Sequence, residues 1–462
     1  MSQTDSPLGT APVGKLVLQL AIPAMLAQFV NILYSVVDRM YVGHIAGAGD
    51  AALAGVGVCA PVVTMITALG ALIGFGGGPL MSIRMGRRDM DGARQIVANS
   101  FYLLLALSVM ATVPLLVFRR QILFTFGCSE ALWEYAEAYF TTYVSGTVFA
   151  VMSYGLNQIT MSQGFSSTAM RSGMLGAAVN IALDPVFIFA LNMGVRGAAL
   201  ATVIGQIFGM ALGLWGVFRH QKVLNVNMKA FKWNRGTVGD IYRVGLPGIV
   251  MQSVVSVMTA GMNGILIAFS QTAVNVLGVY FKLQTFVFMP VFGLNQGALP
   301  VMGYNYGARN RRRLMGAYRI TLTAAVVIMA LGLVLFQLLP EQMLMLFVDR
   351  TDAAAAQEMI EVGVPALKTI SLSFLGAAFG IINSTLFQAT ARGMNSLIVS
   401  VCRQLVVILP AAWMLGRMFG LNAVWYAFPI AEVASFFISY ILLWREYRTE
   451  LRFLGTEKEK KA

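Results

Sequence analysis

Charged residues are scarce in this sequence. Asp, Glu, Lys and Arg together make up 11 % of the 462 residues, less than half of the roughly 25 % found in an ordinary soluble domain. Apolar and aromatic types make up 58 %, and this balance excludes an intrinsically disordered chain, collagen and a coiled coil. A soluble chain of this length would need far more charge to cover its surface. The composition therefore predicts a polytopic membrane protein.

Cysteine and histidine are also rare. Three cysteines without CxxC spacing exclude a disulfide scaffold. The two histidines, His44 and His220, form no HExxH motif, and no Ser/His/Asp set is recognisable. We therefore expect a protein that is not an enzyme and that needs no bound cofactor.

The apolar segments are long enough to cross a bilayer, which takes about 20 residues per helix. Polar clusters divide them into twelve predicted helical spans and indicate an all-α fold. The predicted spans are residues 16–41, 53–78, 93–118, 132–153, 166–191, 194–218, 241–268, 274–300, 316–339, 356–387, 394–415 and 420–444.

The positively charged residues are unevenly distributed between the loops on the two sides of the predicted spans. With the N-terminus placed inside, 24 of the 33 Lys and Arg residues fall in inner segments and 6 in outer ones. This asymmetry predicts that both termini lie in the cytoplasm. It also accounts for the net charge of +13 without nucleic acid, whose binding would concentrate the charge on one folded face. The first apolar run lacks a cleavage site, so we expect it to stay attached as the first span.

The two halves of the sequence resemble each other at an offset of about 221–226 residues. Ala-Ile-Pro at 21–23 corresponds to Gly-Leu-Pro at 245–247, and Asp184-Pro185 corresponds to Leu409-Pro410. Each half holds six spans, so both cross the membrane in the same direction and form a parallel repeat. The predicted segments are a cytoplasmic tail (1–14), an N-lobe (15–218), a linker (219–240), a C-lobe (241–446) and a basic tail (447–462).

Parallel repeats of membrane helices are typical of transporters that hold substrate between the repeats and work by alternating access. Pro23 and Pro247, at matching places in the two halves, each remove a backbone hydrogen-bond donor and favour a bend. A duplicated scaffold without shared chemistry is the alternative.

Ionisable residues inside spans are costly and usually functional. Asp38 ends a polar stripe with Asn31, Tyr34 and Ser35 at helical spacing, which favours a face toward a cavity or another helix. The alternative for Asp38 is an interfacial ion pair with the adjacent Arg39.

Asp184 lies in an otherwise apolar run, and Asn180 shares its helix face. In the next span, Ala198 and Thr202 have the same spacing. Carboxylate, amide, hydroxyl and carbonyl oxygens without histidine or sulfur suit a hard cation such as Na⁺. They suit a proton equally well, and the residues alone do not choose between the two.

The second half lacks this pair of acids, because Leu409 stands where Asp184 would be. Glu432, Lys282 and Arg403 remain as charges within spans and are candidates for a buried ion network. That network could be structural or could face a substrate.

Four segments resemble the multidrug and toxic compound extrusion (MATE) family, in particular its DinF-like/MepA-like bacterial branch. They are Leu-Tyr-Ser-Val-Val-Asp-Arg-Met-Tyr-Val-Gly-His (33–44), Asn-Ile-Ala-Leu-Asp-Pro (180–185), Gly-Val-Arg-Gly-Ala-Ala-Leu-Ala-Thr (194–202) and Gly-Tyr-Asn-Tyr-Gly-Ala (303–308). The resemblance covers residues 13–448. It implies two six-helix lobes and a cation site in the first one.

The resemblance also implies roles for individual residues. Asp38, Asn180, Asp184 and Thr202 would coordinate Na⁺ or exchange protons, with the Ala198 carbonyl as a further ligand and Asn157 and Tyr139 in the surrounding network. Gln28, Asn31 and Tyr34 are the candidates for substrate contact. The acids that NorM-like relatives carry in the seventh and tenth spans are absent here.

The implied function is efflux of bulky, amphipathic and often cationic compounds in exchange for Na⁺ or H⁺. The expected setting is the bacterial inner membrane, with the lipid bilayer and small-molecule drugs or toxins as partners and a monomer as the functional unit. A lipid or saccharide-lipid flippase is the alternative, although such relatives tend to have fourteen spans and cationic cavities.

Overall fold

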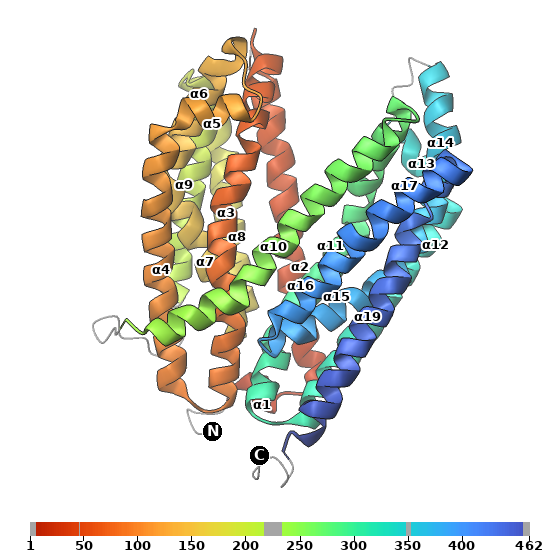
Figure 1. The fold of residues 1–462 in the computed structure, drawn as a ribbon. Coiled ribbons are helices and arrows are strands. Elements are labelled where there is room, and N and C mark those ends of the chain that lie inside the picture. The colour runs from red at the N-terminus through yellow and green to blue at the C-terminus, as the bar shows by residue number, and fades with distance from the viewer. Residues whose placement is uncertain (1–5, 46, 217–232, 348–352, 456–462) are drawn as a thin grey trace. The chain divides into compact units, whose positions relative to one another are not determined.

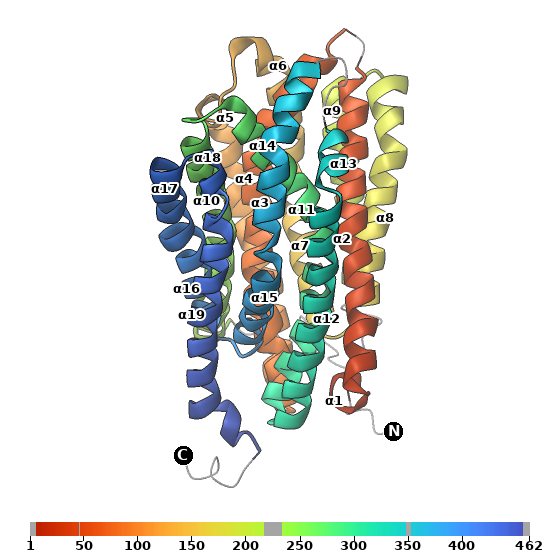
Figure 2. The same ribbon diagram turned by 90° about the vertical axis from the view of Figure 1, so that its right-hand side faces the viewer.

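The computed structural model describes residues 6–45, 47–216, 233–347 and 353–455, and the helices dominate this part of the chain (Figures 1 and 2). No β-strand occurs in those ranges. The all-α prediction is confirmed. Residues 1–5 of the predicted N-terminal tail, 219–232 of the predicted linker, 348–352 with Arg350, and 456–462 of the basic tail lie outside the described ranges.

Ten helical segments of the described chain are long and apolar enough to cross a membrane, and a bent pair raises the number to eleven. Most extend beyond the predicted spans: α3 runs Gly49–Gly86 where 53–78 was predicted, and α11 runs Gln271–Gly307 where 274–300 was predicted. Helices can continue past the apolar boundary because each backbone hydrogen bond is formed within the helix itself.

Two predicted spans are interrupted. The segment 356–387 is the bent pair, in which α14 (Ala353–Ser371) and α15 (Phe374–Ala389) meet at 47°. The segment 132–153 falls across α6 (Glu130–Ser145) and α7 (Thr147–Ser162), each 16 residues long and joined at Gly146. A side chain on Gly146 would collide with Val203 of α9, so the break lies where a neighbouring helix approaches closely.

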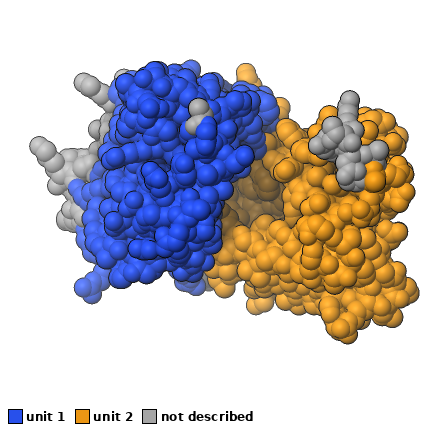
Figure 3. Space-filling model, turned by 90° about the horizontal axis from the view of Figure 1, so that it is seen from above, with its two compact units in different colours: residues 1–11, 19–246 blue, residues 12–18, 247–462 orange. Residues whose placement is uncertain are grey.

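The chain divides into two compact units (Figure 3). Unit 1 comprises residues 1–11 and 19–246, and unit 2 comprises residues 12–18 and 247–462. Helix α10 (Arg235–Leu266) changes unit between Leu246 and Pro247, inside an unbroken helix. The predicted boundaries of lobes, linker and tails stay predictions.

Unit 1 is built on the long helix α3, which packs against α4, α6 and α7, while α9 packs against α6, α7 and α8. Helix α2 contributes its residues from Gln19 onward. The elements of unit 1 not yet given bounds are α1 (Pro7–Thr10), α2 (Val13–Gly43), α4 (Met90–Val117), α5 (Arg119–Thr125), α8 (Ser166–Pro185), the π-helix η1 (Val186–Ala190) and α9 (Gly194–Trp215).

Unit 2 repeats this plan. Helix α11 packs against α12, α14 and α15, and α19 packs against α15, α17 and the π-helix η4. Its remaining elements are α12 (Arg311–Leu338), α13 (Pro340–Met345), α16 (Gly393–Val401), η4 (Cys402–Val407), α17 (Ile408–Phe419), α18 (Leu421–Val424), α19 (Ala427–Thr449) and the 3₁₀ turn η5 (Leu451–Phe453).

The repeat extends to unusual backbone conformations. Arg88 and Arg309, which are separated by the repeat offset of 221 residues, both have positive φ, at 61° and 56°, which is uncommon for residues other than glycine. Gly194 and Gly420 also have positive φ. Asp89 and Asn310 follow the two arginines and cap α4 and α12 through their side-chain oxygens. The same turn is therefore built twice.

Candidate functional site

Helices α8 and α9 approach each other through glycines. A Cβ on Gly205 would lie 2.5 Å from the carbonyl oxygen of Gly176, and a Cβ on Gly176 would lie 2.9 Å from that of Gly205. No side chain fits at either position, and small residues of this kind let membrane helices pack backbone to backbone. The close contact brings Asn180, one turn after Gly176, beside Thr202, one turn before Gly205.

A hydrogen-bonded chain joins the two helices at this point. The Asn180 Nδ2 donates to Thr202 Oγ1 at 3.2 Å and to Asp184 Oδ1 at 3.3 Å. The Thr202 hydroxyl donates to the Ala198 carbonyl at 3.0 Å. Asp184 is 0 % exposed. The structure thus brings together four of the residues predicted for cation coupling.

Asp38 approaches from helix α2. Its side chain is buried, and it interacts electrostatically with Asp184. Arg39 is exposed, and Asp38 Oδ1 has no hydrogen-bond partner in the described part of the chain. The site therefore holds two carboxylates that repel each other whenever both are ionised.

Three buried oxygens at the site have no hydrogen-bond partner among the described residues: Asp38 Oδ1, Asn180 Oδ1 and Asp184 Oδ2. Leaving such groups unsatisfied is costly, and most buried polar atoms in proteins are paired. These acceptors fit a proton or a hard cation as substrate. Thr202 Oγ1 and the Ala198 carbonyl are bonded to each other. The described ranges contain no cluster of three or more His, Cys, Asp or Glu residues suited to a metal ion.

Two tyrosines of α6 line the neighbourhood of Asp38. The rings of Tyr139 and Tyr143 stack with centroids 5.9 Å apart, and Tyr139 interacts electrostatically with Asp38. The Gln206 side chain of α9 donates to the Tyr143 hydroxyl at 3.3 Å. Sequence reasoning missed Tyr143 and Gln206 as members of this network, although each lies four residues after a predicted member, Tyr139 or Thr202.

The other predicted residues are placed differently. Asn157 of α7 lies against Gly213 of α9, 11 residues beyond Thr202, which is about 16 Å along a helix. It is therefore not part of the hydrogen-bonded chain. In α2, Asn31 is exposed and Gln28 is half-buried. Tyr34 is half-buried and interacts electrostatically with both carboxylates.

The backbone is irregular directly after Asp184. Helix α8 ends at Pro185, and the π-helix Val186–Ala190 follows. Proline removes the backbone N–H that would continue the α-helical ladder, and π-turns are frequent at functional sites. Gly197 at the start of α9 packs against Phe187, where a Cβ would collide with the backbone.

The charges predicted for the second half form a pair rather than a network of three. Arg403, within the π-helix Cys402–Val407, bonds to Glu432 of α19 at 2.8 Å. Glu432 is buried. Among the described residues Lys282 forms no ion pair with Glu432, and its ammonium group lies 5.6 Å from the centre of the Phe347 ring.

Comparison with known proteins gives consistent matches. The MatE family model matches residues 23–186 and 247–414, so each match begins at one of the two repeat-related prolines. The multidrug export protein MepA of Staphylococcus haemolyticus is 24 % identical over 430 residues, covering 93 % of each chain. MepA of a Staphylococcus aureus strain is 24 % identical and covers 94 % of each chain.

Solved structures agree. A crystal structure of a MATE protein in the bent conformation is 27 % identical, with a TM-score of 0.87 over 95 % of this chain and 96 % of that one. An outward-facing multidrug resistance MATE family transporter of the MOP superfamily is 27 % identical, with a TM-score of 0.87 over 97 % of this chain and 98 % of that one.

The two matches of the family model account for the internal repeat, and together they span most of the chain. The apolar helices account for a multi-pass membrane protein. The predicted family is confirmed. The chain belongs to the MatE family and is a membrane transporter.

Proposed function

We propose that this protein is a secondary active antiporter that exports amphipathic, often cationic, drugs or toxins in exchange for H⁺ or Na⁺. The observation that carries the proposal is the group of buried, unpartnered oxygens on Asp38, Asn180 and Asp184. The MepA relatives named as multidrug export proteins support the class of substrate.

Each residue has a distinct part in the proposed exchange. Asn180 holds the Asp184 carboxylate through Oδ1 and leaves Oδ2 free. Asp38 supplies the second carboxylate from a different helix. A proton or Na⁺ between them removes their mutual repulsion, so the bound cation favours an arrangement in which α2 lies close to α8.

Drug binding is coupled to the cation through α2. Gln28, Asn31 and Tyr34 precede Asp38 on this helix, and Tyr34 interacts electrostatically with both carboxylates. A cationic drug near Tyr34 would compete with the coupling cation for the same negative charge. Coupling of this kind is reciprocal, so cation binding weakens drug binding by the same factor.

The bend that moves α2 is proposed to centre on Pro23. This proline lies within the continuous helix Val13–Gly43 and frees the carbonyl of Gln19, four residues earlier, from the helical ladder. Pro185 gives a second weak point beside Asp184. Both allow the acids to separate without unfolding a whole helix.

The proposed setting follows from the charge asymmetry. Inner loops rich in Lys and Arg support the proposal that both termini lie in the cytoplasm and that the protein lies in the inner membrane of a bacterium. The bilayer surrounds the helices directly, and each unit holds its own core. We propose that the monomer is the functional unit.

Transport into proteoliposomes tests the proposal. A fluorescent cationic drug is exchanged against a pH gradient and, separately, against a Na⁺ gradient. We expect one gradient to drive transport in the wild type and neither to do so in Asp38→Asn or Asp184→Asn. Asp50→Asn is the matched control, because Asp50 is an exposed acid in the first turn of α3.

Undiminished coupled export in both variants would contradict the proposed role of Asp38 and Asp184 in cation coupling. A lipid-scrambling measurement on the same vesicles addresses the flippase alternative, which predicts scrambling that the two asparagine variants do not change.

A further inference from the structure

The end of helix α19, dark blue in Figure 1, carries charges of opposite sign on opposite faces. Glu446 and Glu450 are four positions apart and project from one face, and Glu446 is 1 % exposed. Arg445 and Arg448 project from the other face and are exposed. Arg452, in the 3₁₀ turn that follows, is exposed as well. The helix end therefore separates its acids from its arginines.

The two acids meet partners inside unit 2. Arg392, in the turn between α15 and α16, bonds to Glu450, and its Nε lies 3.7 Å from Glu446 Oε1. The Thr390 hydroxyl donates to Glu446 Oε1 at 2.9 Å, and the Tyr306 hydroxyl donates to Glu450. The negative charge on this face is therefore balanced by an arginine and two hydroxyl groups of the same unit.

The three arginines have no such balance. Among the described residues, the side chains of Arg445, Arg448 and Arg452 form no ion pair and no hydrogen bond to another residue. Arg445 and Arg448 are neighbours on the helix surface, where like charges repel each other, and Arg452 adds a third positive charge. This face therefore attracts a negative charge from outside the described chain.

Apolar side chains continue the arginine face toward the middle of α19. Val433, Phe437 and Ile441 recur at helical spacing, and each is more than half exposed. The segment Leu421–Thr449 is long and apolar enough to cross a membrane, so this stripe suits contact with lipid chains. Trp444 lies between the stripe and the arginines, and tryptophan is enriched where a membrane meets water. The arginines are therefore expected at the depth of the lipid headgroups.

The Arg448 side chain is oriented by Trp444. Its guanidinium lies 3.8 Å from the centre of the Trp444 ring, which is a cation–π contact. A guanidinium that stacks on an aromatic ring keeps the N–H groups along its edge for other partners, and these match the geometry of phosphate. One cation of the face is thus positioned before a ligand binds.

Helix α17 contains a similar pair without the cluster. Arg417 is exposed and lies 4.5 Å from the centre of the ring of Trp413, four positions earlier. Residues 404–444 contain no other Lys or Arg. The Trp413–Arg417 pair therefore serves as an internal reference for a single arginine beside a tryptophan.

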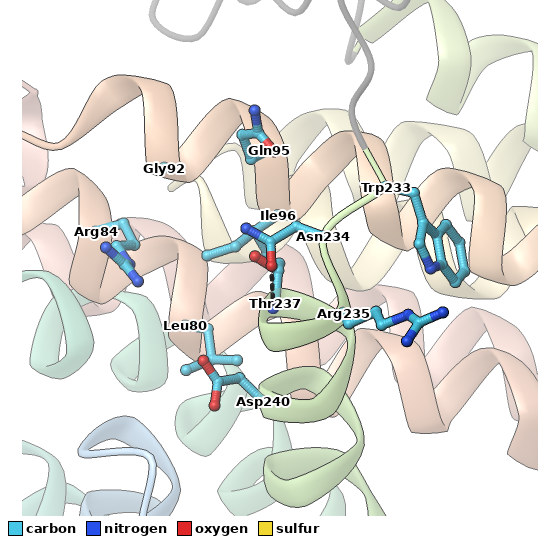
Figure 4. Close-up of a pocket in the computed structure, with 10 residues that line it drawn as sticks. All are labelled: Leu80, Arg84, Gly92, Gln95, Ile96, Trp233, Asn234, Arg235, Thr237 and Asp240. Atoms are coloured by element: carbon cyan, nitrogen blue, oxygen red, sulfur yellow. Dashed lines mark hydrogen bonds between the residues drawn. The ribbon is translucent and has the colours of Figure 1, made fainter.

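The cavity of about 460 Å³ at the start of α10 in unit 1 is a different kind of surface. Figure 4 shows that the Arg84, Arg235 and Asp240 side chains point in different directions. Arg84 pairs with Asp89 at 2.7 Å. The charges around this cavity are of both signs, so it does not select an anion as the arginine face of α19 does.

We propose that the arginine face of α19, formed by Trp444, Arg445, Arg448 and Arg452, binds an acidic glycerophospholipid of the membrane. The guanidinium groups pair with the lipid phosphate through charge-assisted hydrogen bonds, and the acyl chains lie along the apolar stripe. The lipid belongs to the leaflet on the side that the charge asymmetry assigns to the cytoplasm, where arginines beside a membrane helix attract anionic lipids. This role is independent of the cation exchange proposed above.

Native mass spectrometry of the full-length protein in detergent tests the proposal without any transport step. The probes are phosphatidylglycerol, which has a net negative charge, and phosphatidylcholine, which has none, with identical acyl chains. We expect the wild type to bind phosphatidylglycerol more tightly, and added salt to reduce the preference. Each change of Arg445, Arg448 or Arg452 to Gln should weaken phosphatidylglycerol binding about fivefold and leave phosphatidylcholine binding unchanged.

Combined variants separate charge from folding. The triple glutamine variant at positions 445, 448 and 452 should lose the preference for phosphatidylglycerol. The triple lysine variant keeps the charge and should keep the preference. Arg417→Gln is the matched control, because it removes an exposed arginine beside a tryptophan in the same unit, and it should bind both lipids as the wild type does.

Equal binding of the two lipids by the wild type would overturn the proposal, as would a phosphatidylglycerol preference that survives the triple glutamine change. Equal losses in Arg417→Gln and Arg448→Gln would contradict the assignment to the cluster. A glutamate-rich peptide is the probe for an acidic protein segment as the alternative occupant. Its displacement by phosphatidylglycerol supports the lipid, whereas peptide binding that phosphatidylglycerol does not displace would assign the face to a protein partner and overturn the proposal.

Discussion

Each unit buries acid within its spans, but the two units treat the charge differently. In unit 2, Glu432 bonds to Arg403 at 2.8 Å. In unit 1, Asp184 is held by the neutral Asn180 and faces a second acid, Asp38. An arginine partner fixes an acid in its ionised form, whereas an acid facing a like charge gains from taking up a cation. The comparison teaches that the repeat supplies the same frame twice, and that single residues decide whether a buried acid meets an arginine or a second acid.

Each unit contains a π-helix, but the one in unit 1 follows the repeat-related proline and the one in unit 2 precedes it. A π-helix follows Asp184 in unit 1, and a π-helix carries Arg403 in unit 2. The proline after each acid-equivalent position is also retained, as Pro185 and Pro410, but Leu409 replaces the aspartate. Unit 2 therefore keeps the proline without the acid, and its Leu409-Pro410 lies within the α-helix Ile408–Phe419.

The largest expected effect is the loss of coupled export when the buried acid of unit 1, Asp184, is replaced. Asp184→Asn should reduce coupled drug export in proteoliposomes to the level of protein-free vesicles, because the remaining carboxylate no longer has a partner to share the cation with. The double variant Arg403→Met with Glu432→Leu should keep coupled export. Loss of coupling in the double variant together with normal coupling in Asp184→Asn would reverse the assignment of the two units.

The second test concerns unit 2, where we expect substitutions to change the stability of the protein rather than coupled export. Arg403→Gln leaves Glu432 buried without its cation and should cost about 3–5 kcal/mol, whereas the double variant Arg403→Met with Glu432→Leu should cost little. Thermal unfolding of the purified protein in detergent measures both. Equal destabilisation by the single and double changes would contradict the idea that the pair is structural.

The third prediction concerns helix approach. Gly205→Ala should force α8 and α9 apart, separate Asn180 from Thr202 and cost about 1–3 kcal/mol, with a loss of export. Gly376→Ala in unit 2 would press on the Glu432 side chain, where a Cβ comes within 2.9 Å of it, and should lower the melting temperature while export per folded protein stays normal.

Gly173→Ala is the matched control on α8, because nothing lies within 4 Å of an added Cβ there. It should leave melting temperature and export unchanged. A Gly173 variant as damaged as the Gly205 variant would point to helix propensity rather than to helix contact.

The smallest effect compares the repeated caps. Asp89 has a lowered pKa, so the stability it adds is present above its unfolded pKa of about 4 and is lost as the pH falls through the lower folded value. Asn310, its counterpart, does not titrate. Hydrogen exchange should show that protection of the Gly92 amide declines below about pH 4 while that of the Arg313 amide does not.

Asp89→Asn should remove this pH dependence at a cost of a few tenths of a kcal/mol, because asparagine caps a helix about as well as aspartate. If protection of the Gly92 and Arg313 amides changed identically with falling pH in the wild type, the charge of Asp89 would not contribute to the stability of the cap.

Much of the fold followed from the order of residues. The apolar segments, the repeat and the positions of Pro23 and Pro247 are local or periodic signals, and a bilayer leaves few choices other than helices for such segments. The turn shared by Arg88 and Arg309 could also be paired from sequence. The breaks at Gly146 and near Ser373 could not, because they depend on how neighbouring helices approach.

The sequence by itself determined that Asp38 and Asp184 would be the unusual acids and that Asn180 shares a face with Asp184, because helical spacing is local. Only the tertiary structure decided that the Gly176 and Gly205 contact brings Thr202 to Asn180, that Asn157 lies three turns away, and that Arg403 takes Glu432 while Lys282 does not. Contacts between different helices depend on packing distance and on which charge finds its partner, and neither is encoded in the spacing of residues along one helix.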